Sequence, residues 1–156
     1  MSVQNVDKLL RKLKRMDMDV NDTLAPIMAR QAKFVQGEAK DLCPVDQGEL
    51  RDRIKTTTRK SKYKVTALVH TNVEYAPYVE FGTGKVGETT PVANKYPGSL
   101  VYKQTKWRAR IPDVGWRYVA GQPAQPFLYP ALKNNEEKIR DNVANDLKQV
   151  IREARR

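Results

Sequence analysis

Residues 74–84 read EYAPYVEFGTG, in which two tyrosines, a proline and a phenylalanine precede a glycine-rich turn. The spacing of the two tyrosines, Val79 and Phe81 favours a short helical corner, and we expect these side chains to pack it. Gly82 would end that corner, because glycine adopts backbone angles that other residues resist. We interpret the stretch as a corner of the fold, with the glycine turn as the base of a projecting arm.

Glu80 is flanked in this stretch by two apolar residues. A partly buried carboxylate at such a position needs a cation or backbone N–H groups as partners. Arg51 and Arg53 are the candidate cations, and we expect a structural ion pair. An acid and base pair made by Glu74 and Glu80, as in glycoside hydrolysis, is the weaker alternative, because nothing in the sequence supplies a sugar-binding cleft.

The inventory of reactive side chains argues against an enzyme. Nucleophilic catalysis requires a nucleophile, a base and a group that orients the base, and the chain holds one cysteine, Cys43, and one histidine, His70. We expect Cys43 at a helix C-terminus, where the helix dipole disfavours a thiolate. The stretch GTGKVGE lacks the GxxxxGK[ST] spacing of a phosphate-binding loop. We expect no catalytic residue, no cofactor and no metal ligand.

The chain has 156 residues and a formal net charge of +11. This length suits one core, so we expect a single domain over residues 1–156. The charge favours anionic partners, which include nucleic acid and acidic protein surfaces. No apolar run approaches the roughly 18 residues that span a bilayer, and the N-terminus lacks the apolar segment of a secretory signal. We expect no membrane contact and a cytosolic, non-exported product.

The hydrophobic pattern predicts helices at both ends of the chain and strands between them. The predicted elements are a basic amphipathic helix (3–16), a long helix (22–43), a hairpin (50–58 and 63–71), a second hairpin that turns at PDVG (112–115) and a C-terminal helix (130–151). Asn21 or Asp22 would cap the long helix. The order indicates an α+β fold, in which long N- and C-terminal helices pack on an antiparallel β-sheet.

Residues 85–120 are expected to project from the fold as a β-arm or loop. The segment mixes basic and aromatic side chains, which could stack bases and neutralise phosphates of single-stranded nucleic acid. The same side chains could dock on a neighbouring subunit, because Trp, Tyr and Arg dominate protein interfaces. Composition leaves both alternatives open. The arm residues that we expect to make such contacts are Tyr102, Trp107, Arg108, Arg110 and Trp116.

Three motifs follow one another along the chain: CPVDQGELRDRI (43–54), YAPYVEFGTG (75–84) and QPFLYPAL (125–132). Together they resemble the gene-product-ten-like tail-component proteins of HK-type lambdoid phages. Cys43 stands where alanine is common in that family, and Gln47 where threonine is. The resemblance extends from about residue 22 to 151, apart from 85–120. We take these residues as the fold signature or interface: Pro44, Gly48, Leu50, Arg51, Tyr75, Tyr78, Glu80, Phe81, Gly82, Pro126, Phe127 and Pro130.

The resemblance implies a non-enzymatic virion protein that forms a homo-oligomeric ring, such as a hexamer or dodecamer, at the head–tail junction. Its partners would be head-closure or adaptor proteins and tail-terminator or tail-tube proteins, with non-specific contact to channel DNA. A tail terminator that caps the tail tube is the alternative place for the ring. A basic nucleic-acid-binding module is the alternative from another functional class. Before assembly into the virion the protein would reside in the host cytoplasm.

Overall fold

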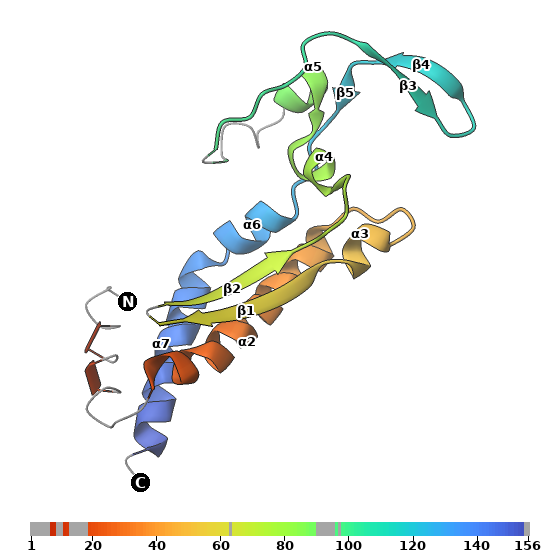
Figure 1. The fold of residues 1–156 in the computed structure, drawn as a ribbon. Coiled ribbons are helices and arrows are strands. Elements are labelled where there is room, and N and C mark those ends of the chain that lie inside the picture. Colours follow the sequence, from red (N-terminus) through yellow and green to blue (C-terminus); the bar gives the residue numbers. More distant parts are fainter. Residues whose placement is uncertain are drawn as a thin grey trace.

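The computed structural model describes residues 7, 8, 11, 12, 19–62, 64–89, 96 and 98–154. It shows an elongated molecule of mixed helix and sheet, with the long helices and one hairpin at one end and a second hairpin at the other (Figure 1). The basic helix expected over residues 3–16 lies mostly outside the described residues.

The long helix α2 (Val20–Leu42) lies along a two-stranded antiparallel sheet made of β1 (Lys55–Ser61) and β2 (Lys64–His70). The Asp19 carboxylate begins α2 by accepting hydrogen bonds from the backbone N–H groups of Asn21 (2.7 Å) and Asp22 (2.9 Å). Asp19 is therefore the cap, and the prediction of Asn21 or Asp22 is wrong. The helix ends before Pro44, because the residue preceding a proline disfavours helical geometry.

The first predicted strand begins later than the sequence pattern indicated. Residues 49–52 form a short helix, α3 (Glu49–Asp52), which follows Gly48 in left-handed geometry (φ 85°). This helix turns Leu50 into the core, where its side chain is 5 % exposed. A run of four helical residues is too short to show a helical period, which is why the alternating pattern suggested a strand.

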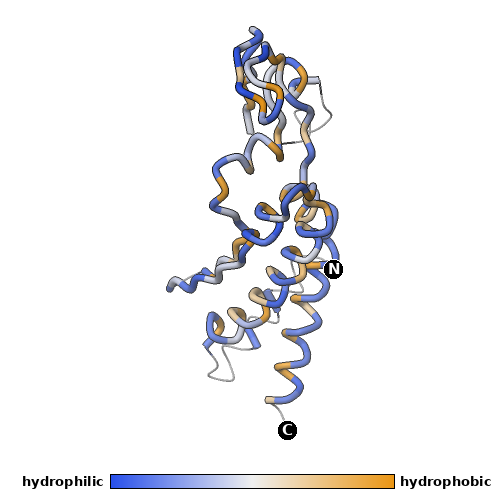
Figure 2. Tube along the Cα trace, turned by 90° about the vertical axis from the view of Figure 1, so that its right-hand side faces the viewer, coloured by the Kyte–Doolittle hydropathy of each residue, from blue (hydrophilic) through white to orange (hydrophobic). Residues whose placement is uncertain are grey.

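The opening motif forms the short helix that we expected. Helix α4 (Ala76–Phe81) ends at Gly82, whose φ is 73°. A second short helix, α5 (Gly84–Glu88), follows at once, so the first residues of the predicted loop are helical. The predicted second hairpin is confirmed with its turn, as β3 (Trp107–Ile111) and β4 (Gly115–Val119). It stands at the end of the molecule far from α7 (Figures 1 and 2).

The chain returns from this hairpin through β5 (Gly121–Gln122). Instead of one C-terminal helix, two follow: α6 (Leu128–Lys133) and α7 (Glu136–Glu153). Asn134 and Asn135 separate them, and the Asn135 side-chain amide donates to the Ala131 carbonyl (2.9 Å). Asparagine favours such local hydrogen bonds over a continuous helix.

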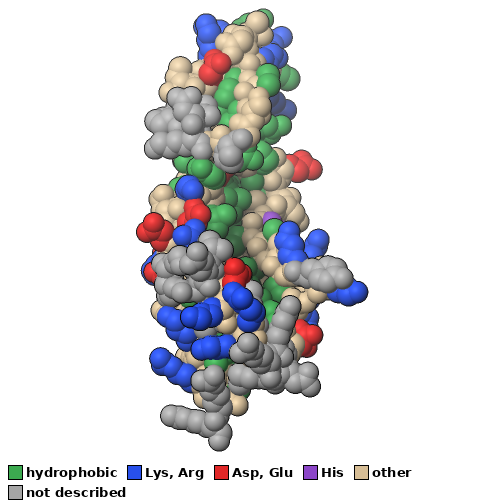
Figure 3. Space-filling model, turned by 90° about the vertical axis from the view of Figure 1, so that its left-hand side faces the viewer, with side chains coloured by type: hydrophobic (Ala, Val, Ile, Leu, Met, Phe, Trp, Pro, Cys, Tyr) green, Lys and Arg blue, Asp and Glu red, His purple; other side chains and the backbone are tan. Residues whose placement is uncertain are grey.

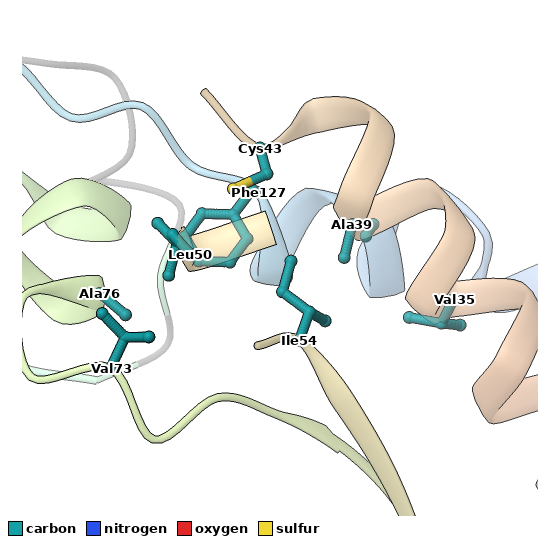
Figure 4. Close-up of a cluster of buried hydrophobic side chains, with 9 residues drawn as sticks. Val35, Ala39, Cys43, Leu50, Ile54, Val73, Ala76 and Phe127 are labelled. Atoms are coloured by element: carbon teal, nitrogen blue, oxygen red, sulfur yellow. The ribbon is translucent and has the colours of Figure 1, made fainter. Parts of the chain in front are cut away.

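The main core lies where the three sequence motifs meet (Figure 4). Leu50 comes from the first motif, Ala76 from the second and Phe127 from the third, and Phe127 is completely buried. A second, smaller cluster joins Ile27 of α2 to Leu147 and Ile151 of α7. The expected α+β fold is thus confirmed, with long N- and C-terminal helices and small antiparallel sheets.

Candidate assembly surfaces

The Glu80 carboxylate joins the second sequence motif to the third. Its Oε2 accepts the backbone N–H groups of Phe127 (2.8 Å) and Leu128 (2.9 Å), and its Oε1 accepts that of Tyr129 (2.8 Å). These N–H groups belong to the start of α6, where a helix has no internal acceptors for them and favours negative charge. The expected ion pair with Arg51 or Arg53 is wrong, because backbone donors occupy both oxygens and Arg53 pairs with Glu49 (3.2 Å).

The two motif tyrosines do not pack the corner as expected. Tyr75 is 43 % exposed and Tyr78 is 58 % exposed, whereas Val79 packs against the main core. Phe81 is half-buried, and its ring centroid lies 4.7 Å from that of Tyr96. The tyrosines are therefore surface residues, which makes them available for contacts outside the subunit.

The base of the arm is a close crossing of two backbone segments. Thr83 and Gly84 form isolated β-bridges with Gln122 and Gly121 respectively. A Cβ atom on Gly121 would overlap the Thr83 carbonyl, so only glycine fits there. A hydrogen bond joins the crossing to α4, since the Gln122 side-chain amide donates to the Tyr78 carbonyl (2.9 Å). The arm therefore leaves and re-enters the fold at one fixed point.

The exposed face of the β3–β4 hairpin is both basic and aromatic. The strand register pairs Arg108 with Tyr118 and Arg110 with Trp116, and side chains of paired residues lie on the same face of a sheet. Tyr118 is 75 % exposed, Trp116 is 56 % exposed, and both arginines are exposed. The Arg108 guanidinium lies 5.4 Å from the centre of the Trp116 ring. We call these four residues the hairpin face.

The other predicted arm residues do not share this face. Trp107 is half-buried on the opposite side of β3, and Tyr102 donates its hydroxyl to the Phe81 carbonyl (2.9 Å) at the base of the arm. Burial raises the pKa of Tyr102 above its usual value, and the nearby Glu88 adds to the rise. Tyr118 was missed from the sequence, although its position two residues after Trp116 places it on the same face.

A second surface surrounds α3 and is rich in carboxylates. It consists of Val45, Asp46, Glu49, Asp52 and Tyr75, and we call it the acidic corner. A small cleft of about 290 Å³ opens there, lined in part by Asp46, Glu49 and Tyr75. Partial desolvation is the main cause that raises the pKa of Tyr75; the nearby Glu49 adds to the rise and Arg53 opposes it.

An apolar groove lies between β2 and α6, with α2 as its floor. Its volume is about 530 Å³, and its lining includes Met28, Val35, Val69 and Leu128. Figure 3 shows a hollowed band of hydrophobic side chains on the face that looks left in Figure 1. Most of the groove's described lining residues are apolar, and the one carboxylate among them, Glu80, is engaged by the start of α6. The groove is suited to protein contact more than to catalysis.

The side chains considered for catalysis, those of Cys43, His70, Glu74 and Glu80, are buried, hydrogen-bonded or distinct from one another in role. Cys43 is buried in the core, and its burial raises the pKa of the thiol. His70 Nε2 lies 2.9 Å from the Thr57 hydroxyl across the β1–β2 sheet. Within the described residues, no group of three or more His, Cys, Asp or Glu side chains is placed to hold a metal ion. Glu74 is exposed, and the Glu80 carboxylate accepts backbone N–H groups at the start of α6, so the two carboxylates do not form an acid and base pair.

The remaining predicted signature residues lie close to the three-motif core. Pro44 and Pro126 are half-buried next to the core residues Cys43 and Phe127 in the sequence, Arg51 is exposed on α3, and Pro130 lies in the first turn of α6. None of the helices in the described part of the chain is both long and apolar enough to cross a bilayer.

Comparison with known proteins gives one match. A family model described as "Bacteriophage HK97-gp10, putative tail-component" matches residues 7–82. The match includes the first sequence motif and the second as far as Gly82, so the third motif lies beyond it. No curated protein and no solved structure gives a significant match. Over residues 7–82 the chain matches the HK97-gp10-like family of phage tail components, the family that its sequence motifs resemble.

Proposed function

We propose that this protein is a structural component of a bacteriophage virion that assembles as a homo-oligomeric ring at the head–tail junction. In that place it joins the tail to the capsid connector around the DNA channel. The observation that carries the proposal is the match to a tail-component family over residues 7–82. The surface supports it, because the hairpin face and the apolar groove expose apolar side chains that an isolated subunit leaves uncovered.

A ring requires two different surfaces on each subunit, since head-to-tail contacts close only when one surface fits another. The hairpin face, the acidic corner and the groove are three such distinct surfaces. Neighbouring head-closure or adaptor proteins and tail-terminator or tail-tube proteins would take the surfaces that the ring leaves open. A tail terminator on top of the tail tube is the alternative position for the same ring.

The proposal is tested in the phage that encodes this chain. Residues 106–119 are replaced by a short Gly/Ser linker, which removes the hairpin and keeps the crossing at Gly84 and Gly121. We expect electron microscopy of the lysate to show separate heads and tails. Arg59→Glu changes an exposed cation on β1 and serves as the control, with normal virions expected. Normal virions from the hairpin deletion would refute a junction role for the arm.

A nucleic-acid-binding module is the second candidate, and the hairpin face favours it. Exposed aromatic rings beside arginines can stack bases and neutralise phosphates. This candidate predicts micromolar or tighter binding of single-stranded DNA at physiological salt, measured by fluorescence anisotropy. The structure changes the expected pattern of variants: Arg108→Ala and Arg110→Ala should abolish binding, whereas Trp107→Ala, on the other side of β3, should not.

A further inference from the structure

The hairpin face has no counterpart within its own subunit. The described part of the arm from Ser99 to Gln122 holds five Lys or Arg residues and one acidic residue, Asp113, which gives a net charge of +4. Figure 1 shows the hairpin well separated from α3 and from the β1–β2 sheet. A partner for this face must therefore come from another molecule, and its chemistry should be acidic with exposed apolar groups.

The acidic corner has this chemistry, on a chain whose net charge is +11. Residues 41–54 hold four carboxylates and two arginines, which gives a net charge of −2. Val45 is 59 % exposed and Tyr75 is 43 % exposed, so apolar surface lies beside the carboxylates. Asp46 and Asp52 form no ion pair within the described part of the chain.

Four carboxylates elsewhere in the described part of the chain have partners within the subunit. Asp19 caps α2, Asp22 pairs with Lys60, and Glu80 holds the start of α6. Asp146 pairs with Arg30 (2.9 Å). The apolar groove supplies hydrophobic surface without available negative charge, so it complements the hairpin face less well than the acidic corner does.

We propose that the hairpin face of one subunit docks on the acidic corner of a second copy, in a head-to-tail contact. The inference rests on the proposed ring and identifies its subunit interface. Arg108 and Arg110 would meet the carboxylates of Asp46 and Glu49, because guanidinium groups bind carboxylates through paired hydrogen bonds. Glu49 pairs with Arg53 (3.2 Å) at an exposed position, where an ion pair stabilises little, so its carboxylate can exchange that guanidinium for one of the partner subunit. The exposed ring of Tyr75 lies beside these carboxylates and can receive a guanidinium on its face. Trp116 and Tyr118 would cover Val45.

Site-directed crosslinking of the full-length chain tests this contact. Arg110→Cys and Asp46→Cys are prepared as separate variants, and the native Cys43 stays in place because it is buried. Neither variant alone should form a disulfide-linked dimer on mild oxidation, whereas their mixture should. A mixture of Arg110→Cys with Leu68→Cys, at the apolar groove, is the matched control and should not crosslink. Crosslinking only to position 68 would overturn the proposal in favour of the groove.

The double variant that carries both cysteines distinguishes head-to-tail from two-fold pairing. A head-to-tail contact gives a ladder of trimers and larger products, because each subunit offers one free surface after pairing. A product that stops at the dimer overturns the head-to-tail contact. The yield should fall at about 1 M salt, where the Debye length is near 3 Å instead of about 10 Å at 0.1 M.

Charge reversal tests this interface independently of the proposed role at the head–tail junction. Trp116→Cys on one subunit should crosslink to Asp46→Cys on another, and adding Arg108→Glu with Arg110→Glu to the first subunit should abolish this crosslink. The compensating change is Asp46→Lys with Glu49→Lys in the partner subunit, whose cysteine is then placed at Val45. This charge-reversed pair should crosslink again. If assembly into virions survives the arginine reversal, the interface is wrong while the junction role stands. If the mixture of Arg110→Cys and Asp46→Cys gives no crosslink, and Arg108→Glu with Arg110→Glu abolishes DNA binding, the proposal is overturned and the hairpin face is assigned to nucleic acid.

Discussion

Among single residues, Glu80 links the second sequence motif to the third. It is 4 % exposed and accepts three backbone N–H groups of the third motif. This explains why a carboxylate stands in an apolar helical corner: it fixes α6 relative to α4 and brings Phe127 into the core. A single side chain thus connects two stretches that lie more than forty residues apart in sequence.

We predict that Glu80→Gln lowers the free energy of unfolding by about 2–4 kcal/mol, because the amide keeps one acceptor oxygen and turns an NH2 group toward a buried N–H donor. Urea denaturation followed by circular dichroism measures the change. Glu74→Gln is the matched control at an exposed position, where the effect should stay within about 0.5 kcal/mol. Equal stabilities of the two variants would contradict a structural role for Glu80.

At the scale of elements, α2 depends on a cap that the sequence pattern placed two or three residues too late. Asp19→Ala should lower the free energy of unfolding by about 1 kcal/mol, because it leaves the N–H groups of Asn21 and Asp22 without their acceptor. Asp19→Asn keeps an acceptor oxygen and should change stability little. Thermal unfolding of both variants measures the difference, and a fully stable alanine variant would show that α2 needs no side-chain cap.

Several elements could be predicted from the sequence because their signals are local. The turn residues PDVG predicted where the second hairpin turns, and Gly82 predicted where α4 ends. Helix α3 was missed because four residues carry no helical period, and the break at Asn134 and Asn135 was missed because the apolar spacing continues across it. Elements whose boundaries depend on a side-chain hydrogen bond leave little trace in the hydrophobic pattern.

The candidate surfaces could be predicted only in part, for a reason that concerns the whole molecule. The sequence indicated that the arm is basic and aromatic, and it indicated three of the four residues of the hairpin face. It could not show that Trp107 lies on the other face from Arg108, because that depends on the strand register. It also could not show that Tyr75 lies exposed among carboxylates, because that depends on the packing of distant segments. Surfaces form from residues that are far apart in sequence.

The whole molecule combines a packed end with an arm that we expect to contribute little to its stability. The members of both buried clusters come from outside residues 83–126. Replacing residues 106–119 with a short Gly/Ser linker should therefore change the free energy of unfolding by less than about 1 kcal/mol, because no buried cluster loses a side chain.

Urea denaturation of the hairpin deletion measures this independence of arm and core. Phe127→Ala, which empties a completely buried position of the main core, is the contrasting variant and should cost about 3–5 kcal/mol. A loss above about 2 kcal/mol in the hairpin deletion would show that the arm supports the fold. An unchanged stability means that a defect in virion assembly reports a lost contact between molecules, since the subunit itself remains folded.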